Sequence, residues 1–267
     1  MSLFLWIVIF SLLGGVLSVL VASTFLLLPG NIRTRLMPHL ISFAIGSLLG
    51  AAFLALLPHA MQGKGVNDFH VLFLTVLLGL LSFFLLEKMV LWRHCHSEHC
   101  EAHGHDDDQH HSHNHGQSAN ATGMMVLIGD AMHNFVDGVL IAAAFLTDIH
   151  LGVVTALAIA AHEIPQEVGD FIVLLHSGFS RAKALFYNVL SSLTTIIGAL
   201  LAYWSLGGME EILPYVLAVA ASSFIYIAVA DLIPGLHKRT EVVATVQQIV
   251  LIASGVTVIY LAHSTLH

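Results

Sequence analysis

Charged residues are scarce in this sequence. Only 10% of its 267 residues are Asp, Glu, Lys or Arg, whereas 57% are hydrophobic. A soluble domain cannot be built from this composition, because too few polar side chains are available to cover its surface. Lys and Arg number nine against 17 Asp and Glu, which argues against nucleic acid as a partner and favours cations.

Cysteine is also rare, and no nucleotide-binding motif is present. The two cysteines, Cys95 and Cys100, lie in one predicted cytoplasmic segment, where a disulfide is not expected. No phosphate-binding loop occurs, so we expect no nucleotide-driven activity, no organic cofactor and no enzyme activity. The first apolar stretch has no basic residues before it, and we interpret it as a retained crossing rather than a signal peptide.

Long apolar runs dominate what is present. At about 20 residues per crossing, the sequence predicts an all-α polytopic membrane protein with a single domain over residues 1–267. The eight predicted transmembrane helices cover approximately residues 3–28, 38–60, 69–92, 123–147, 151–176, 184–206, 212–235 and 242–264.

The few basic residues predict an orientation. If the helices alternate in direction, only Lys64 lies on the side opposite to the other Lys and Arg residues. By the positive-inside rule, the loops after helices 1, 3, 5 and 7 are then cytoplasmic and both termini are outside. We expect a plasma or inner membrane protein. The basic residues of the cytoplasmic side are Arg33, Arg35, Lys88, Arg93, Arg181, Lys183, Lys238 and Arg239.

A weak internal symmetry is visible between helices 2 and 7. Ser47 precedes Pro58 by eleven residues, and Ser223 precedes Pro234 by eleven residues. These helices run in opposite directions. The pattern suggests a 3+2+3 arrangement, in which helices 1–3 and 6–8 form an inverted repeat around helices 4 and 5.

Residues 93–121, between helices 3 and 4, differ in character from the rest. This segment holds nine of the 19 histidines together with both cysteines and several acidic residues. Because it has almost no apolar surface to bury, we expect a disordered cytoplasmic loop that binds borderline metals loosely. A low-complexity linker without metal is the alternative.

Polar residues on helices 4 and 5 form two stripes. At about 100° per residue, four polar side chains share one face of helix 4 and the polar side chains of helix 5 share another. Both stripes lie roughly 15 Å into a hydrocarbon core about 30 Å thick. The predicted metal-site residues are His133, Asn134, Asp137, His162, Glu163, Gln166, Glu167 and Asp170; Asp130 lies on the same stripe of helix 4.

Such polar groups are costly in lipid. Each charged residue at the bilayer centre costs roughly 2.5–3.5 kcal/mol, and a mixture of imidazoles, carboxylates and amides suits zinc and similar divalent ions. A buried polar network without metal is the structural alternative. Pro165 should kink helix 5 and free the carbonyl of Ala161, while Gly138 and Gly169 should permit close helix approach.

The two stripes resemble the ZIP (Zrt/Irt-like) family of divalent metal transporters. His133-Asn134-Phe135-Val136-Asp137-Gly138 matches the helix 4 motif of that family, and the segment 162–170 matches the His-Glu-x-Pro-His-Glu-x-Gly-Asp motif of one branch except at Gln166. The eight-helix layout with its His-rich loop matches over the whole chain.

The resemblance implies a pair of metal sites between helices 4 and 5. A primary site would use His133, Asp137, His162 and Gln166, and a second site would use Asn134 and Glu163 with Asp137 as a bridge. Gln166 departs from the His or Glu of the family. The helix 6 carboxylate of some members corresponds to Thr194 or Thr195, and helix 2 positions that assist in relatives are Ala51 and Ala55.

We therefore expect a secondary or facilitated transporter that carries zinc into the cytoplasm. Fe²⁺, Mn²⁺, Co²⁺ and Cd²⁺ are other candidate substrates. Its expected partners are these ions and the lipid bilayer, with a homodimer left open. His59 would recruit ions outside, and His176 and Asp231 would form an exit relay. An intramembrane zinc protease, suggested by His162-Glu163, and a six-helix cation exporter are the competing interpretations.

Overall fold

The computed structural model describes residues 1–97, 115–237, 239 and 241–266. All regular structure in these residues is helical. Histidine-rich residues 98–114 lie outside the described part, so the predicted loose metal binding by this loop stays a prediction. The described residues confirm the all-α class.

Eight helical crossings are present in the described residues, as predicted. Three of them contain a π-helical segment (η). The crossings are α1 (Leu3–Leu12) with η1 (Leu13–Leu17) and α2 (Ser18–Phe25); α3 (Gly30–Gly50) with η2 (Ala51–Leu56) and α4 (Leu57–Gln62); α5 (Phe69–Ser97); α6 (His115–Thr147); α7 (Ile149–His176); α8 (Arg181–Leu206); α9 (Leu213–Tyr226) with η3 (Ile227–Leu232) and α10 (Ile233–Leu236); and α11 (Val242–Leu266).

Seven of these crossings are long and apolar enough to span a bilayer by length and hydropathy alone, within the described residues. The eighth, α7, is 28 residues long and is not among the seven. Its polar residues, including Glu163, Glu167 and Asp170, lower its hydropathy. The helix that carries most of the predicted site is therefore the one that departs most from an ordinary membrane span.

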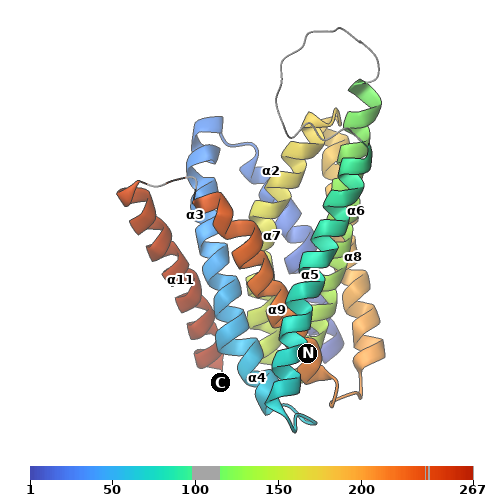
Figure 1. Cartoon of the computed structure of the whole chain (residues 1–267), viewed down its shortest axis with the longest axis vertical. Coiled ribbons are helices and arrows are strands. Elements are labelled where there is room, and N and C mark those ends of the chain that lie inside the picture. The colour runs from blue at the N-terminus through green and yellow to red at the C-terminus, as the bar shows by residue number, and fades with distance from the viewer. Residues whose placement is uncertain (98–114, 238, 240, 267) are drawn as a thin grey trace.

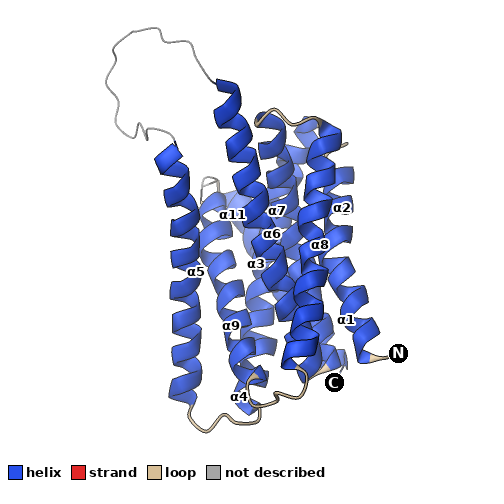
Figure 2. Ribbon diagram, turned by 90° about the vertical axis from the view of Figure 1, so that its right-hand side faces the viewer, coloured by secondary structure: helices blue, strands red, loops and turns tan. Residues whose placement is uncertain are grey.

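The helices run roughly side by side as a bundle (Figures 1 and 2). Both chain termini lie at one end of this bundle, and the end of α5 and the start of α6 lie at the opposite end (Figure 2). This placement agrees with an even number of crossings.

The two halves of the chain share local structure. The π-helical segment η2 begins four residues after Ser47 and ends two residues before Pro58, and η3 has the same spacing from Ser223 and Pro234. Packing follows the same symmetry, because α5 packs on α9 while α11 packs on α3. Each half thus packs its third helix against the second helix of the other half, as expected for an inverted repeat.

Glycines set the closest helix contacts. A Cβ atom added to Gly138 of α6 would lie 1.9 Å from the carbonyl oxygen of Thr195 on α8, and one added to Gly198 would lie 2.1 Å from the oxygen of Phe135. Each glycine therefore admits the backbone of the other helix. No atom lies within 4 Å of a Cβ added to Gly169, so its predicted role in close approach is wrong.

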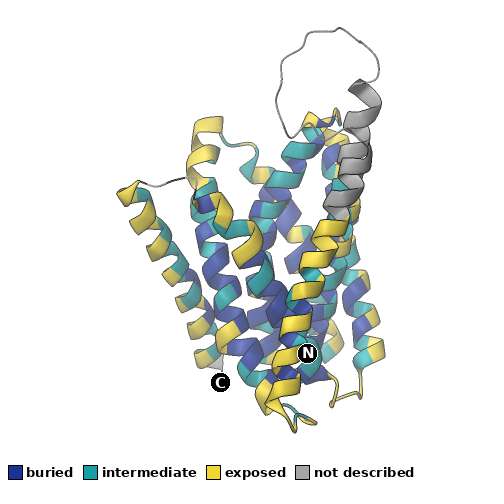
Figure 3. Cartoon of the chain, viewed as in Figure 1, coloured by how far each residue is buried: buried dark blue, intermediate teal, exposed yellow. Residues whose placement is uncertain are grey.

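Burial separates the centre of the bundle from its rim (Figure 3). Helix α7 is largely buried. By contrast, only 17% of the most apolar 18-residue segment of α5 and 11% of that of α11 are buried. The exposed faces of α5 and α11 are rich in Leu, Val and Ile, as expected for surfaces in contact with lipid tails. The predicted polar stripes consequently lie where lipid is excluded.

Candidate metal centre

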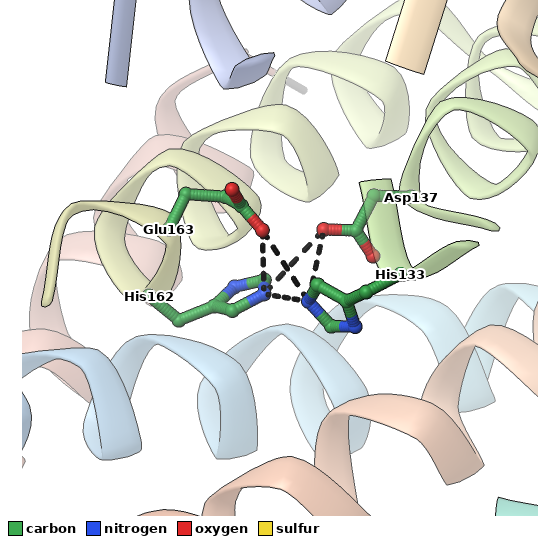
Figure 4. Close-up of side chains that lie close together, drawn as sticks. All are labelled: His133, Asp137, His162 and Glu163. Atoms are coloured by element: carbon green, nitrogen blue, oxygen red, sulfur yellow. Dashed lines mark hydrogen bonds and ion pairs between the residues drawn. The ribbon is translucent and has the colours of Figure 1, made fainter. Parts of the chain in front are cut away.

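Four side chains converge where α6 and α7 face each other (Figure 4). His133 and Asp137 come from α6, and His162 and Glu163 come from α7. One ligand atom from each residue lies within 4.8 Å of the other three. This group is defined here as the four-residue cluster, and it contains the only such set of His, Cys, Asp or Glu atoms among the described residues.

The atoms at the centre of the cluster are the imidazole Nε2 atoms and one oxygen of each carboxylate. The two Nε2 atoms are 3.2 Å apart. His133 Nε2 lies 3.8 Å from Asp137 Oδ2 and 3.3 Å from Glu163 Oε1. His162 Nε2 lies 3.4 Å from Asp137 Oδ2 and 3.7 Å from Glu163 Oε1. Two nitrogen and two oxygen donors therefore surround a common point.

Local helix geometry explains half of this convergence. His133 and Asp137 are four residues apart, which places them one above the other on α6. His162 and Glu163 are adjacent and so diverge by about 100° around α7. They converge on the same point because that point lies between their two directions, in the interface with α6.

The ring of His162 is oriented by its second nitrogen. Its Nδ1 atom lies 3.2 Å from the carbonyl oxygen of Ala158, one turn earlier in α7. Because a carbonyl can only accept, Nδ1 carries the hydrogen, and in the neutral ring Nε2 presents its lone pair to the cluster. The ring of Phe224, 6.3 Å away between centroids, flanks it from α9.

The carboxylates of the cluster accept no hydrogen bond, although one oxygen of each lies 3.3–3.8 Å from the imidazole Nε2 atoms. Both oxygens of Asp137 and both oxygens of Glu163 are buried without a hydrogen-bond partner. Removing a carboxylate from water without a donor or a cation is strongly unfavourable. His133 is the most accessible member, since its side chain is 23% exposed and those of the other three are 1% exposed.

Asn134, a predicted ligand, lies outside the cluster. Its Nδ2 group donates to Asp130 Oδ1 at 3.0 Å and to the Asp130 carbonyl at 3.2 Å, while its Oδ1 accepts from the hydroxyl of Thr195 at 2.8 Å. Asp130 Oδ2 accepts from the hydroxyl of Ser191 at 2.5 Å. These residues form a buried hydrogen-bond network between α6 and α8.

The other three predicted ligands continue along α7. Gln166 is half-buried and its side chain interacts with Asp130 of α6, so its predicted role as a ligand stays a prediction. Glu167 is 0% exposed, and both of its oxygens lack a hydrogen-bond partner. Asp170 is half-buried one turn further on. The acidic surface thus extends from the cluster toward the predicted cytoplasmic end.

The predicted path residues lie apart from the cluster. His59 of α4 stacks edge-on against His263 of α11, with ring centroids 5.2 Å apart. His176 and Asp231 are exposed, and the Nδ1 atom of His176 is bonded to the carbonyl of Ile172. Their roles in ion recruitment and release stay predictions.

Sequence reasoning missed two residues of the α6–α8 network, Ser191 and Thr195, as hydrogen-bond partners. A signal for them exists, because Ser191, Thr195 and Gly198 follow the 3.6-residue period on α8. Hydroxyls at such spacing are common in membrane helices and usually bond their own backbone. The structure was needed to identify Asp130 and Asn134 as their partners.

Comparison with known proteins gives a consistent result. A family model described as ZIP Zinc transporter matches residues 91–263. Zinc transporter ZIP13 of Pongo abelii is 32% identical over 235 residues, which cover 84% of this chain and 66% of that protein. Zinc transporter ZIP13 of Homo sapiens is 30% identical over 260 residues, covering 84% of this chain and 70% of that protein.

A shorter match reaches higher identity. Zinc transporter ZIP4 of Homo sapiens is 43% identical over 114 residues, which cover 43% of this chain and 18% of that protein. The chain therefore spans about two thirds of the ZIP13 proteins and a much smaller share of ZIP4.

Proposed function

The chain belongs to the ZIP zinc transporter family, and from this premise we propose that it carries zinc or a similar divalent cation across the membrane through the four-residue cluster. The relatives are named as zinc transporters. Transport, rather than peptide hydrolysis, is accordingly the activity proposed for this chain.

The observation that carries the proposal is the spacing of the donor atoms. Zinc binds imidazole nitrogen and carboxylate oxygen at about 2.0–2.2 Å in a tetrahedron, so donors bound to one ion stand roughly 3.3–3.6 Å apart. Five of the six donor pairs in the cluster are separated by 3.2–3.8 Å. A zinc ion fits these donors with only small side-chain adjustments.

Charge supports the same assignment. Asp137 and Glu163 together supply two negative charges, and none of their four buried oxygens accepts a hydrogen bond. A divalent cation would balance both carboxylates, whereas a buried network without a cation leaves them uncompensated. We assign His162 as the fixed nitrogen ligand and the more exposed His133 as the ligand that first meets the ion.

The remaining predicted residues receive supporting roles in this proposal. Glu167 and Asp170 would guide the ion along α7 after it leaves the cluster, since they lie one and two turns beyond Glu163. Gln166 would be at most a weak ligand, because a neutral amide binds borderline metals less strongly than imidazole or carboxylate. His59, His176 and Asp231 would act at the two ends of the path.

Direction follows from the distribution of basic residues. The positive-inside rule places the start of α6 and the end of α7 in the cytoplasm, so an ion moving from the cluster along Glu167 and Asp170 enters the cell. We propose that the cluster alternates its exposure by movement of one helical unit against another. Fe²⁺, Mn²⁺, Co²⁺ and Cd²⁺ satisfy the same donor set and are candidate substrates.

Zinc uptake into proteoliposomes tests this function. His133→Ala and His162→Ala should each abolish saturable uptake while the protein is inserted and monodisperse, and His70→Ala, an exposed histidine at the start of α5, should not reduce it. The same vesicles should leave a fluorogenic peptide panel intact. Near-normal uptake by both cluster variants would refute the site, and zinc-dependent peptide cleavage would favour the protease.

A further inference from the structure

Asn134 follows His133 directly but reaches a second helix: its amide oxygen bonds to α8, and its side chain also lies close to Glu167 of α7. It is rotated by about 100° from His133 and by about 60° from Asp137 around α6, which directs it toward α8. Its side chain is 1% exposed and every polar atom of its amide is bonded within the α6–α8 network. The amide oxygen, which is the atom an asparagine offers to a metal, accepts from the Thr195 hydroxyl.

The partners of Asn134 fix its orientation. Thr195 Oγ1 can donate only one hydrogen, and Asp130 as a carboxylate can only accept, so the amide nitrogen must face Asp130 and the amide oxygen must face Thr195. Turning the oxygen toward α7 would leave the Thr195 hydroxyl and Asp130 Oδ1 without this partner in a buried site. Loss of a buried hydrogen bond to a charged group is unfavourable, because the charge then stays buried without its partner.

The same face of α8 holds α6 in two further ways. The hydroxyl of Thr194 donates to the carbonyl of Ala131 at 2.7 Å. One turn beyond, Gly138 lies against the backbone of Thr195. His133 and Asp137 therefore project from a helix whose rotation is set by contacts with α8 at residues 131, 134 and 138.

We propose that Asn134 is a positioning residue rather than a metal ligand: with Asp130, Ser191 and Thr195, it fixes the rotation of α6 so that His133 and Asp137 meet His162 and Glu163. The inference rests on the proposed function of the four-residue cluster. It differs from the second metal site that the family resemblance implies, because Thr194 or Thr195 stands where some members place a carboxylate. One tightly bound ion per chain is expected.

Exchange of donor and acceptor tests this role. Asn134→Asp removes the amide donor and sets a second carboxylate against Asp130, so Zn²⁺ binding to the purified protein in detergent should weaken tenfold or more. The double variant Asp130→Asn with Asn134→Asp restores a donor facing an acceptor at the same net charge. Its affinity should return to within about threefold of the original. Asn31→Asp, at an exposed position of α3, is the matched control.

A ligand would behave differently in each measurement. A carboxylate at position 134 would bind metal at least as well as an amide, so unchanged or tighter Zn²⁺ binding by Asn134→Asp would overturn the inference. Failure of the double variant to recover would do so as well. If both variants misfold, Thr195→Val provides the test: it should weaken Zn²⁺ binding, whereas Thr75→Val, an exposed threonine of α5 that bonds only its own helix, should not.

Spectroscopy separates position from ligation. The visible absorption of bound Co²⁺ reports its ligand set, so Asn134→Ala should weaken Co²⁺ binding without moving the absorption bands. Displaced bands, or a second tightly bound Zn²⁺ equivalent that disappears in this variant, would show that Asn134 is a ligand. If His133→Ala and His162→Ala leave Zn²⁺ binding unchanged, the proposed function itself is wrong.

Discussion

Helix α6 carries two polar faces that differ in how completely they are hydrogen-bonded. Toward α8, Asp130 and Asn134 have partners for both carboxylate oxygens and for the amide oxygen and nitrogen. Toward α7, Asp137 has two buried oxygens without a donor, as does Glu163 opposite it. The two faces lie within a few residues of each other in the same buried environment.

This difference in hydrogen bonding distinguishes a structural polar network from a ligand site. Buried polar groups in stable proteins are nearly all hydrogen-bonded, so the α8 side needs no further component. On the α7 side, the carboxylates accept no hydrogen bond, and the groups beside them are the imidazoles of His133 and His162. Residue type alone does not distinguish the two faces, since both contain carboxylates.

We expect the greatest loss of Zn²⁺ binding when a carboxylate on the α7 side of α6 is neutralised. Asp137→Asn keeps the shape of the side chain and removes one of the two charges that would balance a divalent cation. We expect Zn²⁺ affinity to fall by at least about 100-fold, because a carboxylate ligand is replaced by a weak amide ligand. Equilibrium dialysis with metal analysis measures this. Binding within a few-fold of the original would erase the distinction between the two faces.

Closing the distance between α6 and α8 depends on Gly138. A methyl group there would meet the Thr195 carbonyl at 1.9 Å, so Gly138→Ala must separate the two helices. Overpacking of this kind costs about 1–3 kcal/mol. We expect a markedly lower melting temperature in detergent and weaker Zn²⁺ binding. Gly169→Ala is the matched control, because no atom lies within 4 Å of the added group; equal destabilisation of both variants would contradict this account.

A smaller loss of Zn²⁺ binding is expected from changes in the hydrogen-bond network between α6 and α8. Ser191→Ala removes the donor to Asp130 Oδ2 but leaves the bond from Asn134 in place. The stability loss should be about 1–3 kcal/mol, and Zn²⁺ affinity should change less than in Asn134→Asp. Thermal unfolding and dialysis on the same sample measure both. Ser82→Ala, an exposed serine that bonds only its own helix, is the control; a loss of binding as large as that of Asp137→Asn would make Asp130 a ligand candidate.

Much of the fold could be predicted from hydropathy, because each crossing must satisfy its own backbone and exclude polar groups from lipid. The paired Ser and Pro residues of helices 2 and 7 also indicated the repeat that the π-helical segments η2 and η3 support. Gly169 shows the limit of this reasoning. A glycine permits close approach, but only the packing decides whether a neighbouring helix uses it.

The polar residues of the site could be predicted from the sequence, but not which of them contact α7 and which contact α8. The 3.6-residue period placed the polar residues of α6 on one stripe about 100° wide. A stripe of that width can contact two helices at once, so periodicity could not tell that His133 and Asp137 meet His162 and Glu163 of α7 while the amide oxygen of Asn134 bonds to α8. Glu163 joins His162 in the cluster although the two are adjacent in α7, a convergence that hydropathy does not determine.

The smallest effect concerns the link between the two site helices. Asp148, between α6 and α7, caps α7 by accepting from the backbone N–H groups of His150 and Leu151 at 2.8 and 2.9 Å. Burial alone would raise the pKa of this carboxyl, but the backbone donors at Leu151 and His150, with nearby His150 and His59, hold the pKa below its ordinary value. Asp148→Ala should therefore lower stability by about 1 kcal/mol at neutral pH.

The pH dependence separates the charge of Asp148 from its capping geometry. Because the folded-state pKa is depressed, the stabilisation by ionised Asp148 is fully present above the unfolded-state pKa of about 4 and is lost as the pH falls through the folded value. The difference in melting temperature between the original protein and Asp148→Ala should stay constant from pH 7 to about 5 and shrink below about 4. Asp148→Asn keeps a capping oxygen without the charge, so its stability should lie between the two and its difference from Asp148→Ala should not shrink on acidification. A constant difference between the original and Asp148→Ala down to pH 3 would assign the whole effect to geometry.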